Sequence, residues 1–166
     1  MENKKNSGNW GTFSPESSMD ISDKTNNKIN RNIHKEIVID ATDGVLGRIA
    51  SYAAKHSLFG KNVKIVNCND AIITGDKKMI LEKYKAARRR GGAAMNGPHF
   101  PKHPERIMKR TVRGMLSYTQ GRGLEAFKRV MCYNEVPAEL QGKDKITLKR
   151  EIKVKAIKLS ELCRWL

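Results

Sequence analysis

The sequence predicts an α/β fold, in which crossover helices connect the strands of a small sheet. Three observations lead to this prediction: short runs rich in β-branched residues, helical segments with one apolar face, and their order along the chain. That order is strand, helix, strand, strand, helix, which is typical of an α/β sheet. With 166 residues, the chain is long enough for one domain with a substantial core.

The first strand is predicted at "EIVID", residues 36–40, because a short apolar run of this kind is typical of a buried strand. A helix beginning near Val45 follows, and Asp43 is its predicted capping residue. Gly60 and Lys61 are predicted to end this helix. Its apolar stripe is expected to contain Leu46, Ile49, Ala50 and Ala53.

Two more strands and a second helix are predicted next. The strands are "VKIV" at 63–66 and "AIIT" at 71–74, and Gly75 and Asp76 open the helix. The residues expected on the apolar face of this helix are Met79, Ile80, Tyr84 and Ala87.

Residues 88–104, "RRRGGAAMNGPHFPKHP", are predicted to form a long basic loop. Glycine and proline recur in this segment, and both residues oppose regular secondary structure. Ordered loops of this length usually carry function. Pro104 suits the first turn of a following helix, where its missing N–H group costs nothing.

The helix predicted over residues 106–116 has one basic and one apolar face. The spacing i, i+3, i+4, i+7 places Arg106, Lys109, Arg110 and Arg113 on one side. Such a stripe suits a polyphosphate backbone, because arginine binds phosphate oxygens in a bidentate manner. The alternative is a solvated basic face that pairs with acidic residues elsewhere in the fold. The residues expected to face the core are Ile107, Met108, Thr111, Val112, Met115 and Leu116.

Three further elements complete the expected domain. A short helix follows Gly123 and uses Leu124 and Phe127 for packing. "VMCY", residues 130–133, is predicted to be a last strand. The final apolar cluster "LSELCRWL" is predicted to be a short helix docked on the core.

Residues 1–36 are predicted to be an extension that precedes a domain spanning residues 37–166. The first 32 residues are rich in Asn, Ser, Lys and Asp, and their large apolar residues are scattered singly. Such a segment buries too little apolar surface to fold alone, so we expect disorder. The extension could instead order in an assembly, with Trp10 and Phe13 as anchors.

The charge of the chain indicates a polyanionic partner. Its 33 Lys and Arg residues face 17 Asp and Glu residues, giving a net charge of +16. The excess is concentrated in residues 83–122, where eleven Lys and Arg residues accompany a single acidic residue, Glu105. A pI near 10 favours nucleic acid over an acidic membrane as the partner.

The sequence lacks the motifs of common catalytic and cofactor-binding sites. Residues 43–48, "DGVLGR", do not have the glycine spacing of a dinucleotide site, and no phosphate-loop motif occurs. No convincing nucleophile triad is present, and Asp40 and Asp43 are assigned to turns and caps. No apolar run is long enough for a membrane span, and the N-terminus lacks the apolar core of a secretory signal.

Metal and disulfide sites are also not expected. The three cysteines are an odd number at irregular spacings, which argues against a disulfide framework and favours a reducing compartment. His99 and His103 lie four residues apart, but neighbouring prolines exclude a helix there, so packing or RNA stacking is favoured over metal binding. Phe100, Tyr118 and Tyr133 border the basic region and are equally compatible with base stacking and with packing.

Four segments resemble the L-thirteen family of large-subunit ribosomal proteins in its archaeal and eukaryotic form. In chain order they are "VIDATDGVLGRIAS" (38–51), "VKIVNCNDAIITG" (63–75), "GPHFPKHPERIMKRTVRGML" (97–116) and "GRGLEAFKRVMCYNEVP" (121–137). The resemblance covers residues 37–166, and "RTVRGML" between Gly-Pro and Arg-Gly is its most specific part. The closing "LSELCRWL" is more similar to archaeal than to eukaryotic members.

The resemblance implies a three-layer α/β/α sandwich around a small, mostly parallel sheet. It implies a cytoplasmic structural constituent of the large ribosomal subunit that binds ribosomal RNA, contacts neighbouring ribosomal proteins, and supports subunit assembly and translation. An enzyme, a cofactor, a small-molecule substrate and a membrane partner are not expected. The implied RNA-binding residues are Arg48, Arg88, Arg89, Arg90, Lys102, Arg106, Lys109, Arg110, Arg113 and Arg122.

The chain departs from the family pattern at three positions. Ser117 replaces a usual proline, Gln120 stands where a basic residue is frequent, and His99 replaces a common aromatic residue. Two alternative functions are a nucleotide-using α/β enzyme, which would need a phosphate loop, and a regulator of messenger RNA outside the ribosome. The regulator would use the same basic surface, so the sequence does not separate it from the ribosomal function.

Overall fold

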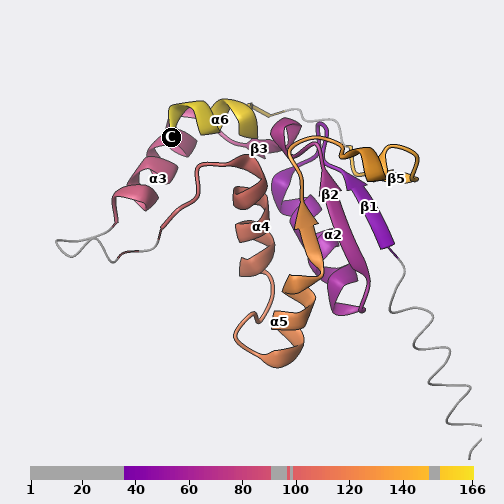
Figure 1. The fold of residues 1–166 in the computed structure, drawn as a ribbon. Helices are drawn as coiled ribbons and strands as arrows, with labels where there is room; N and C mark the ends of the chain where they lie inside the picture. The colour runs from indigo at the N-terminus through magenta and orange to yellow at the C-terminus, as the bar shows by residue number, and fades with distance from the viewer. Residues whose placement is uncertain (1–35, 91–96, 98, 150–153) are drawn as a thin grey trace, which may run out of the picture. The chain divides into compact units, whose positions relative to one another are not determined.

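A computed structural model describes residues 36–90, 97, 99–149 and 154–166 (Figure 1). Apart from Glu36, the extension predicted for residues 1–36 lies outside these ranges. The middle of the predicted basic loop, residues 91–96 and 98, also lies outside them.

A four-stranded parallel sheet forms the centre of the domain. Its strands are β1 (Glu36–Asp40), β2 (Asn62–Val66), β4 (Val130–Cys132) and β5 (Lys145–Thr147), in the order β4-β2-β1-β5. The register places Val38 opposite Lys64 on β2. The α/β class with a small parallel sheet is therefore confirmed, and the strands predicted at 36–40, 63–66 and 130–133 are present.

The two faces of the sheet are covered differently. Alternate residues of β1 and β2, such as Ile39 and Ile65, are buried in the main core beneath the helices. The intervening Val38 and Val66 face a smaller cluster on the other side. Leu140, from the 3₁₀ turn η3 (Ala138–Leu140), closes that cluster, so this outer layer is thin.

Helix α2 (Leu46–Leu58) connects β1 to β2 and packs its apolar stripe on the sheet. Its predicted stripe is fully buried. The prediction that Asp43 caps this helix is wrong, because Val45 takes the N-cap position and no side chain makes a capping hydrogen bond. Asp43 adopts a left-handed conformation with φ +54° in the preceding turn, and its carboxylate lies 4.0 Å from the ammonium group of Lys149.

The strand predicted at 71–74 belongs to a separate two-stranded sheet. In this sheet β3 (Ile72–Thr74) pairs antiparallel with β6 (Ala156–Lys158). Neither β6 nor β5 was expected from the sequence. Helix α6 (Leu159–Trp165) follows β6 and buries Leu159 and Leu162, which confirms the docked C-terminal helix.

Helix α3 (Lys77–Arg89) uses a narrower apolar face than predicted. Ile80 is buried with Leu162 and Ile157, and Tyr84 packs at the edge of the same cluster. Met79 is wrongly assigned to this face, since 68% of its surface is exposed. On α3, positions 80 and 84 lie one turn apart, while position 79 points to a different side.

Helices α4 (Pro104–Gly114) and α5 (Gly121–Lys128) complete the main core together with α2. Pro104 is the first residue of α4, as predicted. Met115 and Leu124 are wrongly assigned to the core, because they are 44% and 43% exposed. Met115 lies beyond the end of α4, so the helical period no longer sets its direction.

A glycine allows the close approach of α5 to the end of α4. The turn after α4 brings the main chain of Ser117 against Gly123, which is buried. A Cβ atom on Gly123 would overlap the Ser117 carbonyl group, so only glycine fits this position without a shift of the main chain.

Candidate nucleic-acid interface

The basic stripe of α4 is formed as the sequence predicts. We use this name for Arg106, Lys109, Arg110 and Arg113, which share one side of the helix. The opposite side buries Ile107, Met108 and Val112, none of which is more than 1% exposed. Burial of the apolar side fixes the rotation of the helix, so the four cations must face outward.

Within the described ranges, no member of the basic stripe forms an ion pair with a carboxylate. The partners are neutral groups. Arg110 donates a hydrogen bond of 3.2 Å to the carbonyl oxygen of His99, and its guanidinium carbon lies 4.5 Å from the centroid of the Phe100 ring. These contacts orient the guanidinium group and leave its charge uncompensated.

Two further members of the stripe lie over aromatic rings. The Lys109 ammonium group is 5.3 Å from the centroid of Phe127, and the Arg113 guanidinium carbon is 5.1 Å from the centroid of Tyr118. Phe127 comes from α5 and Tyr118 from the turn before it. The rings bordering the stripe therefore serve first as supports for its cations.

The stripe lines a shallow hollow of about 250 Å³. His99, Pro101 and Phe127 form the remainder of its wall, and no carboxylate lines it. A concave surface that is lined by positive charges and no negative ones concentrates positive potential. This arrangement is suited to phosphate groups, which accept hydrogen bonds from guanidinium and ammonium groups.

Arg88 and Arg89 lie in the last turn of α3 and not in a loop. Arginine is a good helix former, so α3 continues through Arg88 and Arg89. Arg88 donates a hydrogen bond to the main-chain oxygen of Leu166, and both arginines line a hollow of about 370 Å³ with Trp165. Arg90 is exposed directly after the helix.

Aromatic contacts connect this end of α3 to α4. Tyr84, one turn before Arg88, meets the Phe100 ring edge-on with 5.2 Å between the ring centroids. Phe100 in turn supports Arg110. Lys102 is exposed just before α4, and Arg122 is exposed on the first turn of α5, so both flank the basic stripe along the chain.

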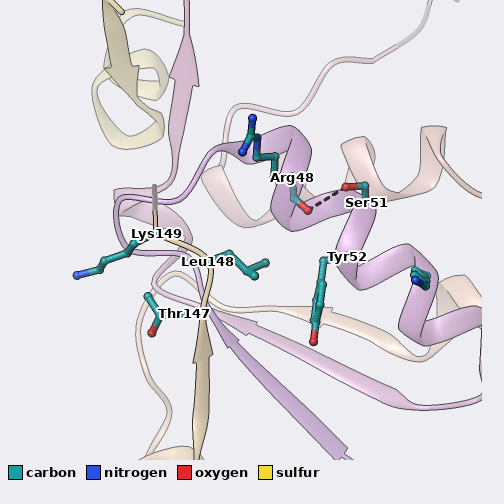
Figure 2. A pocket seen from close by; sticks show the side chains of 7 residues that line it. Arg48, Ser51, Tyr52, Thr147, Leu148 and Lys149 are labelled. Carbon is teal, nitrogen blue, oxygen red and sulfur yellow. Dashed lines mark hydrogen bonds between the residues drawn. The ribbon is translucent and has the colours of Figure 1, made fainter. Parts of the chain in front are cut away.

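Arg48 lines a different hollow. It is exposed in the first turn of α2, and its hollow of about 560 Å³ shares no residue with that of the basic stripe (Figure 2). The opposite wall comes from residues 147–149, at the end of β5. No pattern in the sequence predicts this wall, because it lies far along the chain from Arg48 and no local signal joins the two.

Cys132 and Cys163 are held in their protonated form. The pKa of the Cys132 thiol is raised mainly by a hydrogen bond with Cys68 and to a smaller extent by burial. Burial raises the pKa of Cys163 to about 11. Protonated thiols are poor nucleophiles and poor metal ligands. Among the residues with described positions, no group of three metal-ligating side chains occurs.

Asp40 has a structural role, as expected from the sequence. Burial raises its pKa, but hydrogen bonds from Thr42 and Asn67 outweigh that effect and hold the pKa below its ordinary value. The Thr42 hydroxyl donates at 2.6 Å and the Asn67 side-chain amide at 3.0 Å. The carboxylate therefore joins the loop after β1 to the loop after β2.

Comparison with known proteins identifies one family. A family model described as ribosomal protein L13 matches residues 34–139. Three archaeal relatives are each named "Large ribosomal subunit protein uL13". The Archaeoglobus fulgidus protein is 50% identical over 107 residues, which is 64% of this chain and 68% of the relative. The Natronomonas pharaonis protein is 41% identical over 128 residues, and the Methanocaldococcus jannaschii protein is 42% identical over 132 residues.

The aligned shares are larger for the second and third relatives. They are 76% of this chain and 88% of the Natronomonas protein, and 78% of this chain and 96% of the Methanocaldococcus protein.

None of the helices in the described ranges has the length and apolar character that a membrane span requires.

Proposed function

Because this chain belongs to the ribosomal protein L13 family and is a structural constituent of the large ribosomal subunit, we propose that it binds ribosomal RNA through the basic stripe of α4. It is not an enzyme. Its partners are large-subunit RNA and neighbouring ribosomal proteins.

One observation carries the proposal about the surface. Four cations share one side of α4, and their contacts among the described residues are with ring faces, a methionine sulfur and a main-chain oxygen instead of carboxylates. A structural salt-bridge network would compensate these charges within the protein. The uncompensated charges attract phosphate, and their fixed spacing favours a backbone with regularly repeated phosphates.

The α/β body acts as a rigid mount for this surface. The buried side of α4 packs against α2 and the sheet, so the cations are held in place before RNA arrives. Preorganisation lowers the entropic cost of binding. The stripe would neutralise and brace phosphates where RNA segments converge, and Arg88–Arg90, Lys102 and Arg122 would extend the contact along the backbone.

The test is the salt dependence of binding to deproteinised large-subunit RNA. Arg110→Glu and Arg113→Glu are compared with the full-length parent chain and with Lys78→Glu, a matched charge reversal at an exposed position on α3. Each lost phosphate contact reduces the slope of log affinity against log salt by about 0.7–0.9. Slopes for both stripe variants equal to that of Lys78→Glu would refute the proposed surface.

A further inference from the structure

The hollow between α2 and the end of β5 is a second feature with the chemistry of an RNA site. Four of its residues lie on α2 with the spacing i, i+3, i+4, i+7: Arg48, Ser51, Tyr52 and Lys55. This spacing repeats that of the basic stripe on α4, but here an aromatic ring and a hydroxyl group stand between the two cations. The facing wall is Thr147, Leu148 and Lys149.

The floor of the hollow is apolar and its rim is cationic. Figure 2 shows Leu148 pointing from the end of β5 toward Tyr52 on α2, and both side chains are partly buried against the main core. Arg48 and Lys55 are exposed at opposite ends of the helical face, separated by two turns or about 10 Å along the axis. No carboxylate lines the hollow.

The cations of the rim are available to a ligand. Within the described part of the chain, neither Arg48 nor Lys55 takes part in an ion pair. Lys149 approaches Asp43 only at 4.0 Å, and both side chains of that pair are more than half exposed. An exposed pair at this distance is weak, so the rim keeps a positive charge.

The Tyr52 ring contacts a second aromatic ring on α2. The His56 ring, one turn further along α2, lies 4.3 Å from it between centroids. Burial and then the charges of Lys61 and Lys55 lower the pKa of His56, so this histidine is neutral at pH 7. The two rings are tilted by 53°, and Tyr52 but not His56 lines the hollow, so the Tyr52 ring is available to a ligand there.

We infer that this hollow holds one unpaired nucleotide of ribosomal RNA, with its base against Tyr52 and Leu148 and its flanking phosphates at Arg48 and Lys55. An aromatic platform between cations is the usual arrangement for unpaired bases, which stack without sequence-specific hydrogen bonds. Ser51 and Thr147 also line the hollow, and the Ser51 hydroxyl donates a hydrogen bond of 3.0 Å to the Arg48 carbonyl oxygen, so it can act as an acceptor for a 2′-hydroxyl or a base edge. The volume of about 560 Å³ is within the range for a ligand of nucleotide size.

One wall of the hollow lies beyond the residues that the family model matches, whereas the α2 wall lies within them. That model ends at residue 139, whereas the wall opposite α2 lies at residues 147–149. The inference rests on the proposed function in that its ligand is the same RNA, but it uses none of the residues of the basic stripe.

The experiment combines ultraviolet crosslinking with affinity measurements on the full-length chain and deproteinised large-subunit RNA. Tyr52→Leu removes the aromatic face and keeps an apolar side chain, whereas Tyr52→Phe keeps the ring. We expect a crosslink between an RNA nucleotide and the peptide containing Tyr52. We expect Tyr52→Leu to lose it and to bind roughly tenfold more weakly, while Tyr52→Phe behaves like the parent. Thermal unfolding of each variant verifies its fold.

Other outcomes separate this inference from the proposed function. If Tyr52→Leu binds RNA like the parent while Arg110→Glu binds weakly, the nucleotide site is wrong and the basic stripe stands. If Tyr52→Leu weakens binding and the stripe variants do not, the site stands and the α4 surface is wrong. If the Tyr52 peptide crosslinks to a ribosomal protein in reconstituted subunits and not to RNA, the hollow is a protein contact and the inference is overturned.

Discussion

The Arg110 guanidinium group lies 4.5 Å from the centroid of the Phe100 ring, whose edge contact with Tyr84 spans 5.2 Å between centroids. One ring thus connects α3 to the most constrained cation of the basic stripe. Arg110 also donates a hydrogen bond to the carbonyl oxygen of His99, the residue before Phe100. His99 and Phe100 together therefore hold the Arg110 guanidinium group. The segment before α4 therefore acts as a support for the basic stripe, the proposed RNA surface.

We expect Phe100→Leu to weaken RNA binding without unfolding the chain. Leucine retains apolar bulk but removes the ring beneath Arg110, so this side chain samples more rotamers and loses more entropy on binding. The expected loss is about 0.5–1 kcal/mol of binding free energy, which is a two- to fivefold loss of affinity. Titration of the full-length variant with large-subunit RNA measures it.

A double-mutant cycle with Arg110→Gln provides the control for this prediction. If Phe100 acts by orienting Arg110, its replacement has little further effect once Arg110 is gone. Additive losses in the double variant would show that Phe100 acts on RNA independently of Arg110.

Gly123→Ala is expected to destabilise the fold by about 1–3 kcal/mol. The added methyl group would meet the main-chain carbonyl of Ser117, which a side-chain rotation cannot relieve. Gly121→Ala is the matched control two residues earlier, where a Cβ atom has nothing within 4 Å. Urea unfolding of both variants tests the contrast, and equal stabilities would contradict the close contact between α5 and the turn after α4.

The stability of the fold is expected to depend on pH through Glu36, the first residue of the inner strand β1. Hydrogen bonds from Lys143 and then Lys64 lower the pKa of Glu36 below the ordinary 4.5, and they outweigh the opposing effect of burial. A depressed folded-state pKa stabilises the protein fully above the unfolded-state pKa, and this contribution is lost as pH falls through the folded-state value.

Glu36→Gln therefore separates this contribution from other acidic groups. Above pH 4.5 the variant should be less stable than the parent by about 0.5–1 kcal/mol, because the two ion pairs are partly exposed. The difference in unfolding free energy between the variant and the parent should shrink as the pH falls below 4.5. A difference in unfolding free energy that is constant with pH would mean that Glu36 does not titrate as described.

The elements predicted from sequence are those with strong periodicity. The strand 36–40 and the helices beginning at Leu46 and Pro104 bury regular apolar patterns, so their burial is readable from residue order alone. The basic stripe of α4 is predictable for the same reason. By contrast, β5 (Lys145–Thr147) is only three residues long and all three are exposed, so its short polar and apolar alternation is too weak a signal to predict a strand.

The remaining errors come from local choices that tertiary contacts decide. Asp43 is a plausible cap in sequence, but the turn needs a left-handed residue there, and aspartate tolerates that conformation better than most. The glycines that follow Arg88 and Arg89 in the sequence predict a loop there, whereas α3 continues through both arginines. The hollow at Tyr52 depends on residues 147–149, and only the folded chain brings those segments together.

The most direct test of the central claim is co-sedimentation of the tagged, full-length chain with large ribosomal subunits through a high-salt wash. The parent chain should remain with the subunit, because its basic stripe would be buried against RNA. The double variant Arg110→Glu, Arg113→Glu, verified to be folded, should appear at the top of the gradient. Retention of that variant in the subunit peak to the same extent as the parent would contradict the claim that the α4 stripe is the RNA surface.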